Sequence, residues 1–467
     1  MVERTDYRRV ADAVAREIEA GTLRGGERLP TQRAFARRRG IANSTAIRVY
    51  GELARRGLVV GEVGRGTFVR AAPPHAGGAA LTERREAGGQ EGHDLPRSPA
   101  VNLELNYPVV DGQAELMARA LGPLSRADVL LEATRAAAPD GTAAAREAAA
   151  SVVARGGWRP DPDRLLFAGN GRQAIAAALS SLVRPGGRVG VEEVTYPLVG
   201  AIAEQLGIRL VPIAMDEEGM LPGALADAHR RASLAAVYVQ PTLQNPLSVT
   251  AGPERLAQLA HAVREVGCWA VEDGIWGFLA DCAPAPLAAL LPERVVFLDS
   301  LSKRLAPGLT LGMLAVPPAH RNALARALRS GGWAAGAFGL EAAVRWAGDG
   351  TVETLVAAKR ADATARHALV RALRERLASA GVKGRIRTDP RSYYCWWELP
   401  PPWRAETFVA AAAARGIAVT PGPAFAVGGY RAADAVRIGL ASPPPDVLAA
   451  ALDTLAAIAA EGPLRGA

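Results

Sequence analysis

The chain has 467 residues, a formal net charge of +8, and 49% hydrophobic residues. This length predicts two or three globular domains rather than one. No run of 18 or more apolar residues is present, and the charged first ten residues lack an apolar signal region. We therefore expect no membrane span and no export, and the predicted location is the cytoplasm.

The positive charge is concentrated at the N-terminal end of the chain. Residues 1–70 contain 15 Arg and 8 Asp or Glu, a net charge of +7. The other 397 residues contain 40 basic and 39 acidic residues, a net charge of +1. Such an asymmetry is expected of a nucleic-acid-binding module. An arginine-rich solvated face would carry the same charge, so charge alone does not separate the two interpretations.

Two helices are predicted in the first forty residues. The stretch "YRRVADAVAREIEAGTL" has apolar residues at helical spacing from Val10 onward, and Gly21 is the expected end of this helix. A second helix is expected to begin at Thr31, directly after Pro30, and to end at Gly40.

A third helix and a β-hairpin follow. The stretch "IANSTAIRVYGELARRG" places Ile47, Tyr50 and Leu53 on one helix face. The stretch "LVVGEVGRGTFV" has two apolar runs around a Gly-Arg-Gly tip, which predicts a hairpin. Three short helices and a hairpin are typical of a winged helix-turn-helix, whose third helix enters the major groove of DNA.

The candidate DNA-contacting residues lie on the second helix, on the hairpin tip, and on or beside the third-helix face opposite Ile47. The arginines would mostly hold phosphates, which fixes position rather than base sequence. The set is Arg33, Arg37, Arg38, Ser44, Thr45, Arg48 and Arg65.

The run "GERLPTQRAFARRRGIANSTAIRVYGELARRGLVVGEVGRGTFV" resembles the GntR-type DNA-binding domain from its second helix through its wing. The resemblance implies double-stranded DNA as a partner. Asn43 departs from the family pattern, which often has Arg at this place. The alternative is a helical docking domain that never meets DNA.

Residues 71–99 are rich in Pro and Gly, carry scattered charge and show no apolar period, so they predict a flexible or partly extended linker. From about residue 100 short apolar runs alternate with stretches long enough for helices. This pattern predicts an α/β domain over 100–467 with a mostly parallel sheet, ending in a small α+β subdomain from about residue 380. The runs are "RLLFAGN", "RVGVEE", "IRLVPIA", "AAVYVQP", "CWAVEDG" and "VVFLDSLS".

The three cysteines of the chain lie far apart and lack ligand spacing, which predicts neither disulfides nor a metal site. We expect Cys268, Cys282 and Cys395 to be buried small hydrophobes.

Polar residues after the predicted strands are the candidate site residues, because ligands bind beyond the carboxyl ends of such strands. The backbone N–H groups after "FAGN" would open a helix toward an anion. One of the three lysines of the chain, Lys303, follows the last run. In chain order the candidates are Gly171, Arg172, Gln173, Tyr196, Asn245, Asp273, Ser300, Ser302 and Lys303.

In this order the motifs resemble the fold-type I pyridoxal phosphate enzymes, in their aminotransferase-like branch, over about residues 100–460. With the GntR-like segment in front, the chain resembles the MocR subfamily of GntR regulators. The resemblance implies a transcription regulator that depends on pyridoxal 5'-phosphate, forms a homodimer and responds to an amino acid or an amine.

The chemistry of the cofactor explains the residue types. A Schiff base needs an amine that can lose its proton, which arginine cannot supply, so Lys303 is the candidate for the internal aldimine. The resemblance implies Asp273 at the pyridine nitrogen, Asn245 as donor to the ring hydroxyl and Tyr196 stacked on the ring. Arg437, in "AVRIGLAS", would bind the carboxylate of the effector. The remaining implied cofactor contacts are Gly171, Arg172, Gln173, Trp276, Ser300, Ser302 and Arg304.

The large domain departs from the family pattern in three places, one of which is Leu247 and Ser248 in place of the common Thr-Gly after Asn245. The run "S-K-x-L-A-P-G-x-R" usually ends in a phosphate-binding arginine, and here Thr310 stands in its place. Arg304 or Arg172 would then have to replace that arginine. Trp276 stands where the related motif has a tyrosine that donates to the ring hydroxyl, which leaves Asn245 as the main donor.

A regulator is the leading interpretation, with an amino compound or the cofactor itself as its effector. Two alternatives stay open at this point. The chain could be an active aminotransferase that carries a DNA-binding domain. It could also be a regulator whose large domain senses a ligand without pyridoxal phosphate, or only dimerises.

Overall fold

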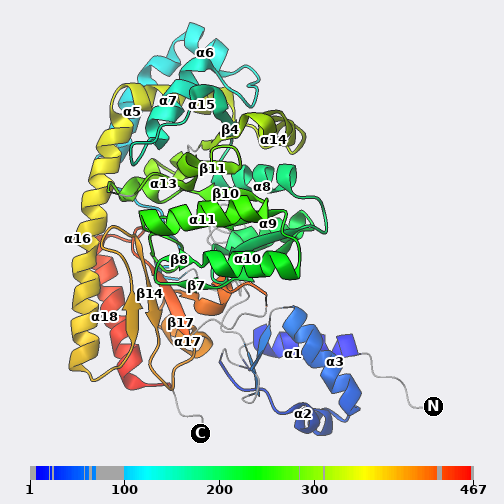
Figure 1. Ribbon diagram of the computed structural model, residues 1–467. Helices are drawn as coiled ribbons and strands as arrows, with labels where there is room; N and C mark the ends of the chain where they lie inside the picture. Colours follow the sequence, from blue (N-terminus) through cyan, green and yellow to red (C-terminus); the bar gives the residue numbers. More distant parts are fainter. Residues whose placement is uncertain are drawn as a thin grey trace.

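The computed structural model describes residues 7–19, 22–23, 26–56, 58–62, 66–69, 99–282, 284–308, 311–428 and 434–463. The predicted linker up to residue 98, Arg65 of the hairpin tip and Thr310 lie outside these residues. Figure 1 shows a small N-terminal unit beside a larger α/β unit.

The N-terminal unit is a winged helix-turn-helix. Thr31 caps the second helix by accepting a hydrogen bond from the Ala34 N–H, and Gly40 ends this helix in the left-handed conformation, with a φ of 61°. Both predicted helix boundaries are confirmed. The elements are α1 (Tyr7–Glu19), α2 (Gln32–Arg39), α3 (Asn43–Arg55) and the antiparallel pair β1 (Val59–Glu62) and β2 (Gly66–Val69).

The core face of α3 differs from the predicted one. Its buried residues are Ala46, Val49, Tyr50 and Leu53, whereas Ile47 is 49% exposed. The buried positions follow the spacing of one helix face, and each step along a helix turns by about 100°. Ile47 therefore points away from the core, and its predicted place beside Tyr50 and Leu53 is wrong.

A seven-stranded sheet forms the centre of the larger unit, in the order β4-β12-β11-β10-β9-β5-β6. All neighbouring strands are parallel except β12, which is antiparallel to both β11 and β4. Six strands match the predicted apolar runs, and β12 is the additional one. The strands are β4 (Leu165–Ala168), β5 (Arg188–Glu192), β6 (Arg209–Ile213), β9 (Ala236–Val239), β10 (Trp269–Asp273), β11 (Val295–Ser300) and β12 (Gly312–Ala315).

Helices cover both faces of this sheet, which is the predicted fold-type I architecture. Val296 and Leu298 of β11 pack in one core with α8 and α14, and Val295 and Phe297 pack in the other with α7 and α11. Figure 1 shows α10 and α11 across the face nearer to the viewer. The helices are α5 (Gln113–Leu121), α6 (Ala127–Ala133), α7 (Ala143–Val153), α8 (Gly171–Leu182), α9 (Pro197–Gln205), α10 (Pro222–Arg231), α11 (Pro253–Val266), α12 (Leu287–Leu290), α13 (Leu301–Arg304), α14 (Pro318–Ser330) and α15 (Ala337–Gly348).

The long helix α16 (Thr351–Ser379) runs alongside both the large sheet and the small subdomain (Figure 1). The small subdomain has an antiparallel sheet in the order β13-β14-β17-β16, packed on α16, α17 and α18. None of the helices in the described part of the chain combines the length and apolar content that a bilayer crossing requires. The remaining elements are β13 (Arg385–Arg387), β14 (Tyr394–Glu398), α17 (Ala405–Ala414), β16 (Thr420–Pro421), β17 (Ala435–Gly439), α18 (Pro445–Glu461) and the short strands β3 (Val101–Asn102), β7 (Met215–Asp216), β8 (Gly219–Met220) and β15 (Ile417–Ala418).

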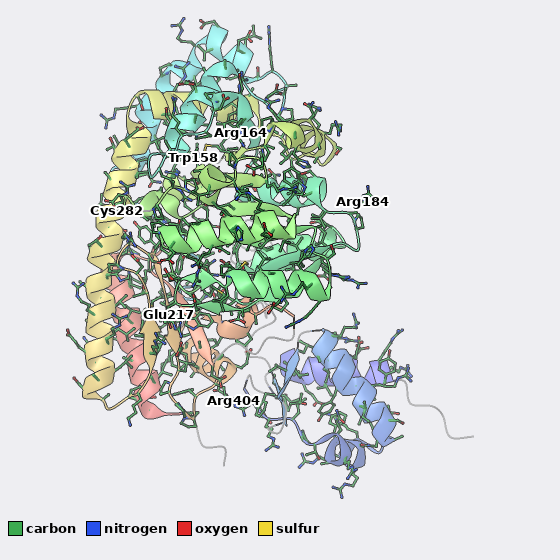
Figure 2. The ribbon with its side chains drawn as sticks, viewed as in Figure 1. Trp158, Arg164, Arg184, Glu217, Cys282 and Arg404 are labelled. Carbon is green, nitrogen blue, oxygen red and sulfur yellow. The ribbon has the colours of Figure 1, made fainter. Side chains whose placement is uncertain are left out.

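The winged helix touches the small subdomain directly. The guanidinium of Arg404, at the start of α17, lies 4.0 Å from the centre of the Phe68 ring on β2. Gly26 faces Thr407 so closely that a Cβ on the glycine would lie 3.0 Å from a side-chain carbon. Figure 2 shows Arg404 on the side of the small subdomain that faces the winged helix.

Two of the three cysteines are placed as predicted. Cys268 and Cys395 are buried, and burial raises the pKa of the Cys268 thiol to about 11 and that of Cys395 to about 12. Cys282 is exposed (Figure 2), so the expectation that it is buried is wrong. It lies in a turn after β10, where the chain leaves the core.

Gly141 provides a stability test of the large core. Its φ is +56°, and a Cβ there would lie 2.8 Å from the buried Phe167 ring. Gly141→Ala should lower the unfolding free energy by about 2–4 kcal/mol, through left-handed strain and overpacking. Gly350→Ala is the control, because Gly350 has a φ of +80° but open space around it, and it should lose only about 1–2 kcal/mol. Equal losses in urea unfolding would contradict the contact with Phe167.

Candidate functional site

A cavity of about 170 Å³ lies at the carboxyl ends of β4, β10 and β11, where β17 of the small subdomain closes one side. This is more than the roughly 10–15 Å³ that a single water needs, so the cavity can hold a ligand. Ten of the twelve predicted cofactor and effector residues line it. They are Gly171, Arg172, Tyr196, Asn245, Asp273, Trp276, Ser300, Ser302, Lys303 and Arg437.

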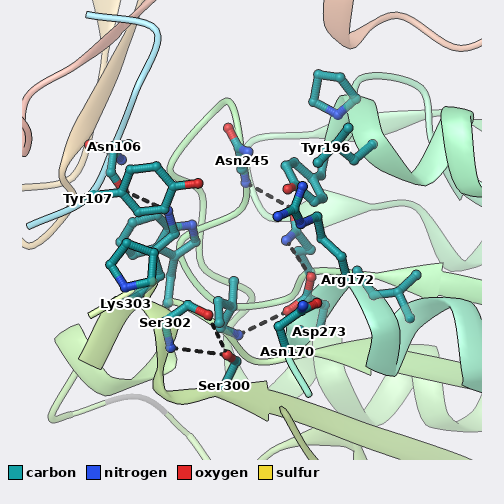
Figure 3. A pocket seen from close by; sticks show the side chains of 18 of the residues that line it. Asn106, Tyr107, Asn170, Arg172, Tyr196, Asn245, Asp273, Ser300, Ser302 and Lys303 are labelled. Carbon is teal, nitrogen blue, oxygen red and sulfur yellow. Dashed lines mark hydrogen bonds between the residues drawn. The ribbon is translucent and has the colours of Figure 1, made fainter. Parts of the chain in front are cut away.

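The amine of Lys303 reaches into this cavity from α13 (Figure 3). Its Nζ donates a hydrogen bond of 2.7 Å to the carbonyl of Asn106 and lies 3.7 Å from the centre of the Tyr107 ring. Burial lowers the pKa of Lys303 well below its ordinary value, and nearby positive charge, that of Arg437 above all, lowers it further. The site therefore favours the neutral, nucleophilic form of this amine.

Asp273 ends β10 at the floor of the cavity and is almost fully buried. Its carboxylate accepts hydrogen bonds from the Tyr238 hydroxyl (2.5 Å), the Gln240 side-chain amide (3.0 Å) and the Ile275 N–H (3.0 Å). Burial raises the pKa of Asp273 to about 6, although these hydrogen bonds oppose the rise. Near neutral pH this group can therefore hold or release a proton at its place in the cavity.

A second buried acid lies behind Asp273. Glu192, at the end of β5, accepts hydrogen bonds from the Gln240 N–H and the Gln244 side chain, both at 3.2 Å. Burial raises its pKa to about 8. Gln240 also accepts a hydrogen bond of 3.3 Å from the Asn245 N–H, so one glutamine connects both acids with the loop that carries Asn245.

The first turn of α8 supplies the predicted anion-binding amides, with one correction. Asn170 caps this helix by accepting a hydrogen bond of 2.9 Å from the Gln173 N–H. That N–H is therefore engaged, and Gln173 does not line the cavity. A Cβ on Gly171 would lie 3.3 Å from the Cβ of Ser300, so the α8 turn and the serine segment converge on one side of the cavity.

Arg304 does not reach the cavity, contrary to the prediction. Its side chain is buried and forms an ion pair of 2.5 Å with Asp299, and its guanidinium lies 5.2 Å from the centre of the Phe278 ring. In the short helix α13 it points away from Lys303, because adjacent helical residues face different directions. Of the two arginines proposed to replace the family's phosphate ligand, only Arg172 lines the cavity.

Arg437 closes the cavity from the small subdomain. Its Nη2 donates to the carbonyl of Glu104 and, at 3.3 Å, to the hydroxyl of Thr420. Its Nε is buried and has no hydrogen-bond partner among the described residues. Burial lowers the pKa of Arg437. A carboxylate is the ligand that satisfies a buried guanidinium best.

The DNA-facing candidates lie on the exposed side of the winged helix. Arg33, Arg37 and Arg38 are exposed on α2, and within the described residues none of the three takes part in an ion pair. Ser44 and Arg48 are exposed on α3, and Thr45 is half-buried. Arg48 lies 4.6 Å from the centre of the Tyr7 ring. Ile47 is exposed and lies between Ser44 and Arg48 in the sequence of α3. The sequence prediction did not include this apolar residue on the exposed face.

Several residues in or next to the cavity were not predicted. Tyr107 lines the cavity from an "NYP" stretch before α5, and Tyr238, which bonds Asp273 without lining the cavity, lies within a strand whose apolar pattern conceals its hydroxyl. Glu104 and Gln240 also line the cavity and were not among the predicted site residues. Gln240 could have been predicted from its position, because it directly follows the run "AVYV" at a strand end, where ligands bind.

Glu192 predicts a pH dependence of stability. Its pKa is raised from 4.5 to about 8, so the folded protein retains a proton that the unfolded chain has released. The contribution of Glu192 to the free energy of unfolding therefore falls as the pH rises from about 4.5 to about 8. Glu192→Gln should remove that fall. The stability of the variant relative to the wild type should therefore be higher at pH 8 than at pH 5.

The measurement is the thermal midpoint of both proteins across this range. Exposed Glu218→Gln is the control and should follow the wild-type profile. Parallel profiles for the wild type and Glu192→Gln would contradict the raised pKa.

Comparison with known proteins agrees with both units. The family "Aminotransferase class I and II" matches residues 106–455, and "Bacterial regulatory proteins, gntR family" matches residues 6–69. The uncharacterized HTH-type transcriptional regulator YdeF of Bacillus subtilis is 27% identical over 94% of this chain and 91% of its own length. The probable rhizopine catabolism regulatory protein MocR of Rhizobium meliloti is 26% identical over 67% of this chain and 65% of its own.

The fold of the larger unit is also found in solved structures. The kynurenine aminotransferase of Pyrococcus horikoshii superposes with a TM-score of 0.70 and 23% identity, covering 83% of this chain and 94% of that one. The family match spans most of the chain, and the gntR-family match lies directly before it. The chain belongs to the aminotransferase class I and II family and carries a gntR-family domain directly in front of the matched region.

Proposed function

We propose that this protein is a pyridoxal phosphate-dependent, DNA-binding transcription regulator of the cytoplasm, with Lys303 as the anchor of the cofactor and an amino acid or amine as effector. One observation carries the proposal. The amine of Lys303, whose pKa is lowered by burial, faces the same cavity as the buried guanidinium of Arg437. The same chain also has a winged helix.

The unsatisfied polar groups of the cavity fit this cofactor and an amino-acid effector. The Oδ1 of Asn245 is buried without a partner among the described residues, as is the Nε of Arg437. A ring hydroxyl would donate to the first, so Asn245 would act as an acceptor here and not as the donor expected from the resemblance, and a carboxylate would accept from the second. The cradle between Gly171 and Ser300, next to Arg172, suits a phosphate. Each polar part of the two ligands thus has a matching group in the chain.

Pyridoxal phosphate, when bound, supplies an aldehyde that condenses with an amine, releasing water, and a ring that withdraws electrons when its nitrogen is protonated. Lys303 offers the amine in its neutral form. Asp273 is placed to hold a proton at the ring nitrogen, because its pKa of about 6 still favours the carboxylate at neutral pH. Trp276 and Tyr107 flank the amine and exclude water from it.

An effector amino acid would enter between the amine and Arg437. Arg437 orients its carboxylate, and the effector's own amine then competes with Lys303 for the same partner. Binding at Arg437 would act on β17 of the small subdomain. Arg404, at the start of α17 in the same subdomain, contacts Phe68 of the winged helix. The ligand and the DNA-binding unit would thus be connected through the small subdomain and the non-covalent contact of Arg404 with Phe68.

A homodimer is part of the proposal. Leu130 and Leu131 on α6 are 40% and 60% exposed, and Phe338 on the adjoining α15 is 38% exposed. Neighbouring exposed apolar side chains of this size are typical of an interaction surface. Two winged helices related by a two-fold axis would match paired DNA half-sites.

The function is tested by footprinting the DNA upstream of the protein's own gene, with and without pyridoxal phosphate and amino acids. The wild type should carry a visible absorbance band of bound cofactor and show a footprint that changes with cofactor or amino acid. Lys303→Ala should lose the band and the change while still binding DNA. The exposed Lys383→Ala is the control and should behave as wild type.

A band that survives in Lys303→Ala would overturn the role of this lysine. Appreciable transamination of many amino acids without specific DNA binding would instead favour an aminotransferase. Regulation unchanged by the cofactor would favour a ligand sensor that works without it.

The winged helix predicts a salt-dependent contact at Arg37. Arg37→Ala should weaken binding to all DNA sequences alike and reduce the slope of log affinity against log salt by about 1, because one phosphate contact is lost. Arg55→Ala is the matched control, since Arg55 is exposed on α3 but paired with Glu52 at 2.7 Å. Fluorescence anisotropy at several salt concentrations measures both. Equal slopes in the two variants would contradict the assignment of this face to DNA.

A further inference from the structure

A second lysine lies directly beneath the first. Lys359, in the middle of α16, is fully buried. Its Nζ donates hydrogen bonds to the carbonyl of Lys303 itself, at 3.0 Å, and to the carbonyl of Leu305, at 2.7 Å. These carbonyls belong to the end of α13, a helix of four residues whose last carbonyls have no helical N–H to accept from. The amine of Lys359 therefore supplies the hydrogen bonds that the helix end lacks.

The residue type fits this task. Three of the 55 basic residues are lysines, and the others are arginines. An arginine cannot lose its charge and would bring five N–H donors to a place that offers two carbonyls. A lysine amine brings three donors when charged and two when neutral. In its neutral form the two N–H donors match the two carbonyls, so no N–H donor of the amine is left unsatisfied.

The neighbours of Lys359 hold it in place. The hydroxyl of Tyr393 donates to the Lys359 carbonyl at 2.7 Å and also bonds the carboxylate of Asp362 at 2.9 Å. The side-chain amide of Gln113, on α5, donates to the Leu305 carbonyl at 3.1 Å, so this oxygen is held from two sides. All these groups are buried or nearly so, and the segment that carries Lys303 rests on a rigid frame.

Resting on the function proposed above, we propose that Lys359 is a positioning residue for Lys303: by fixing the Lys303 and Leu305 carbonyls it holds the Lys303 amine in the cavity, ready for an aldehyde, before any ligand arrives.

This role does not depend on the charge of Lys359. Burial lowers its pKa to about 7, while Asp362 on the same helix acts in the opposite direction. The other titratable or charged groups around it are Lys303 and Arg304 on α13 and Tyr393. Both protonation states keep at least two N–H donors, so both carbonyls stay bonded on either side of pH 7. When charged, Lys359 also lowers the pKa of Lys303, which adds to the neutral fraction of that amine.

The test uses the full chain and its small number of lysines. Cofactor-free wild type, Lys359→Met and the exposed control Lys383→Met are trace-labelled with acetic anhydride over a pH series, and labelling is assigned to each lysine by peptide mass. Lys359→Met should move the pH midpoint of Lys303 labelling upward, because a segment that has lost both hydrogen bonds exposes the Lys303 amine to water and raises its pKa. It should also slow covalent capture of added pyridoxal phosphate, trapped with borohydride, by roughly tenfold, the effect of about 1.4 kcal/mol. Lys383→Met should match the wild type in both.

Unchanged labelling and capture in Lys359→Met would overturn the positioning role. A wild type that captures no pyridoxal phosphate would overturn the proposed function, and the labelling profile of Lys303 would still decide the role of Lys359.

If Lys359→Met does not fold, the wild type provides a second measurement. Lys359 should label at least roughly tenfold more slowly than Lys383 at every pH at which the protein is native, because its amine is buried and bonded. Equal rates at the two lysines would overturn the inference.

Discussion

The site depends on the removal of one amine from water. Burial in the cavity lowers the pKa of the Lys303 amine, and the positive charges of Arg437, Lys359 and Arg172 lower it further, which favours the neutral form. The rest of the architecture supplies this environment. The carboxyl ends of the parallel strands place Asp273 and Asn245 opposite the amine, and the small subdomain closes the cavity with Arg437. An open cleft with the same residues would leave a charged, hydrated lysine.

The scarcity of lysine in this chain follows from the same physics. Arginine serves at the surface, where a permanent charge and a planar group are useful for ion pairs and phosphates. The two lysines inside the large unit occupy places where a permanent charge would be costly. The function proposed above needs the first, Lys303, as a nucleophile, and the second, Lys359, donates hydrogen bonds to two carbonyls. A carbonyl compound that reaches this protein therefore meets few lysine amines.

Much of the fold was predictable from local patterns. The six apolar runs became strands, and the residues that follow them met at one edge of the sheet, because parallel strands bring their carboxyl ends together. Two features were not predictable in this way: the additional strand β12 and the choice of which α3 residues are buried. Both depend on packing between segments that are distant in the sequence, and a short stretch of sequence does not show it. Arg304 and Gln173 failed for a different reason. Each sits one residue from a true lining residue: the ion pair with Asp299 holds the Arg304 side chain, and the cap by Asn170 occupies the backbone N–H of Gln173.

Tyr238, Gln240 and Glu192 were not predictable as site residues, because each has an ordinary role in a strand or at its end. Only the fold shows that they share hydrogen bonds around Asp273 and Asn245. The motif residues alone describe the site incompletely, because they include Asp273 but not the second buried acid, Glu192. Glu192, whose pKa is raised to about 8, lies outside the cavity lining and is linked to it through Gln240.

Helix α16 sets the geometry at two points. Lys359 bonds the carbonyl of Lys303, and Arg366, two turns further along, bonds the carbonyls of Leu440 and Pro443, just beyond the strand that carries Arg437. Seven residues of helix span about 10 Å and hardly stretch. One stiff helix therefore links the segment that carries Lys303 to the segment that follows the strand of Arg437. A ligand that spans Lys303 and Arg437 would meet a distance that does not adjust to its length.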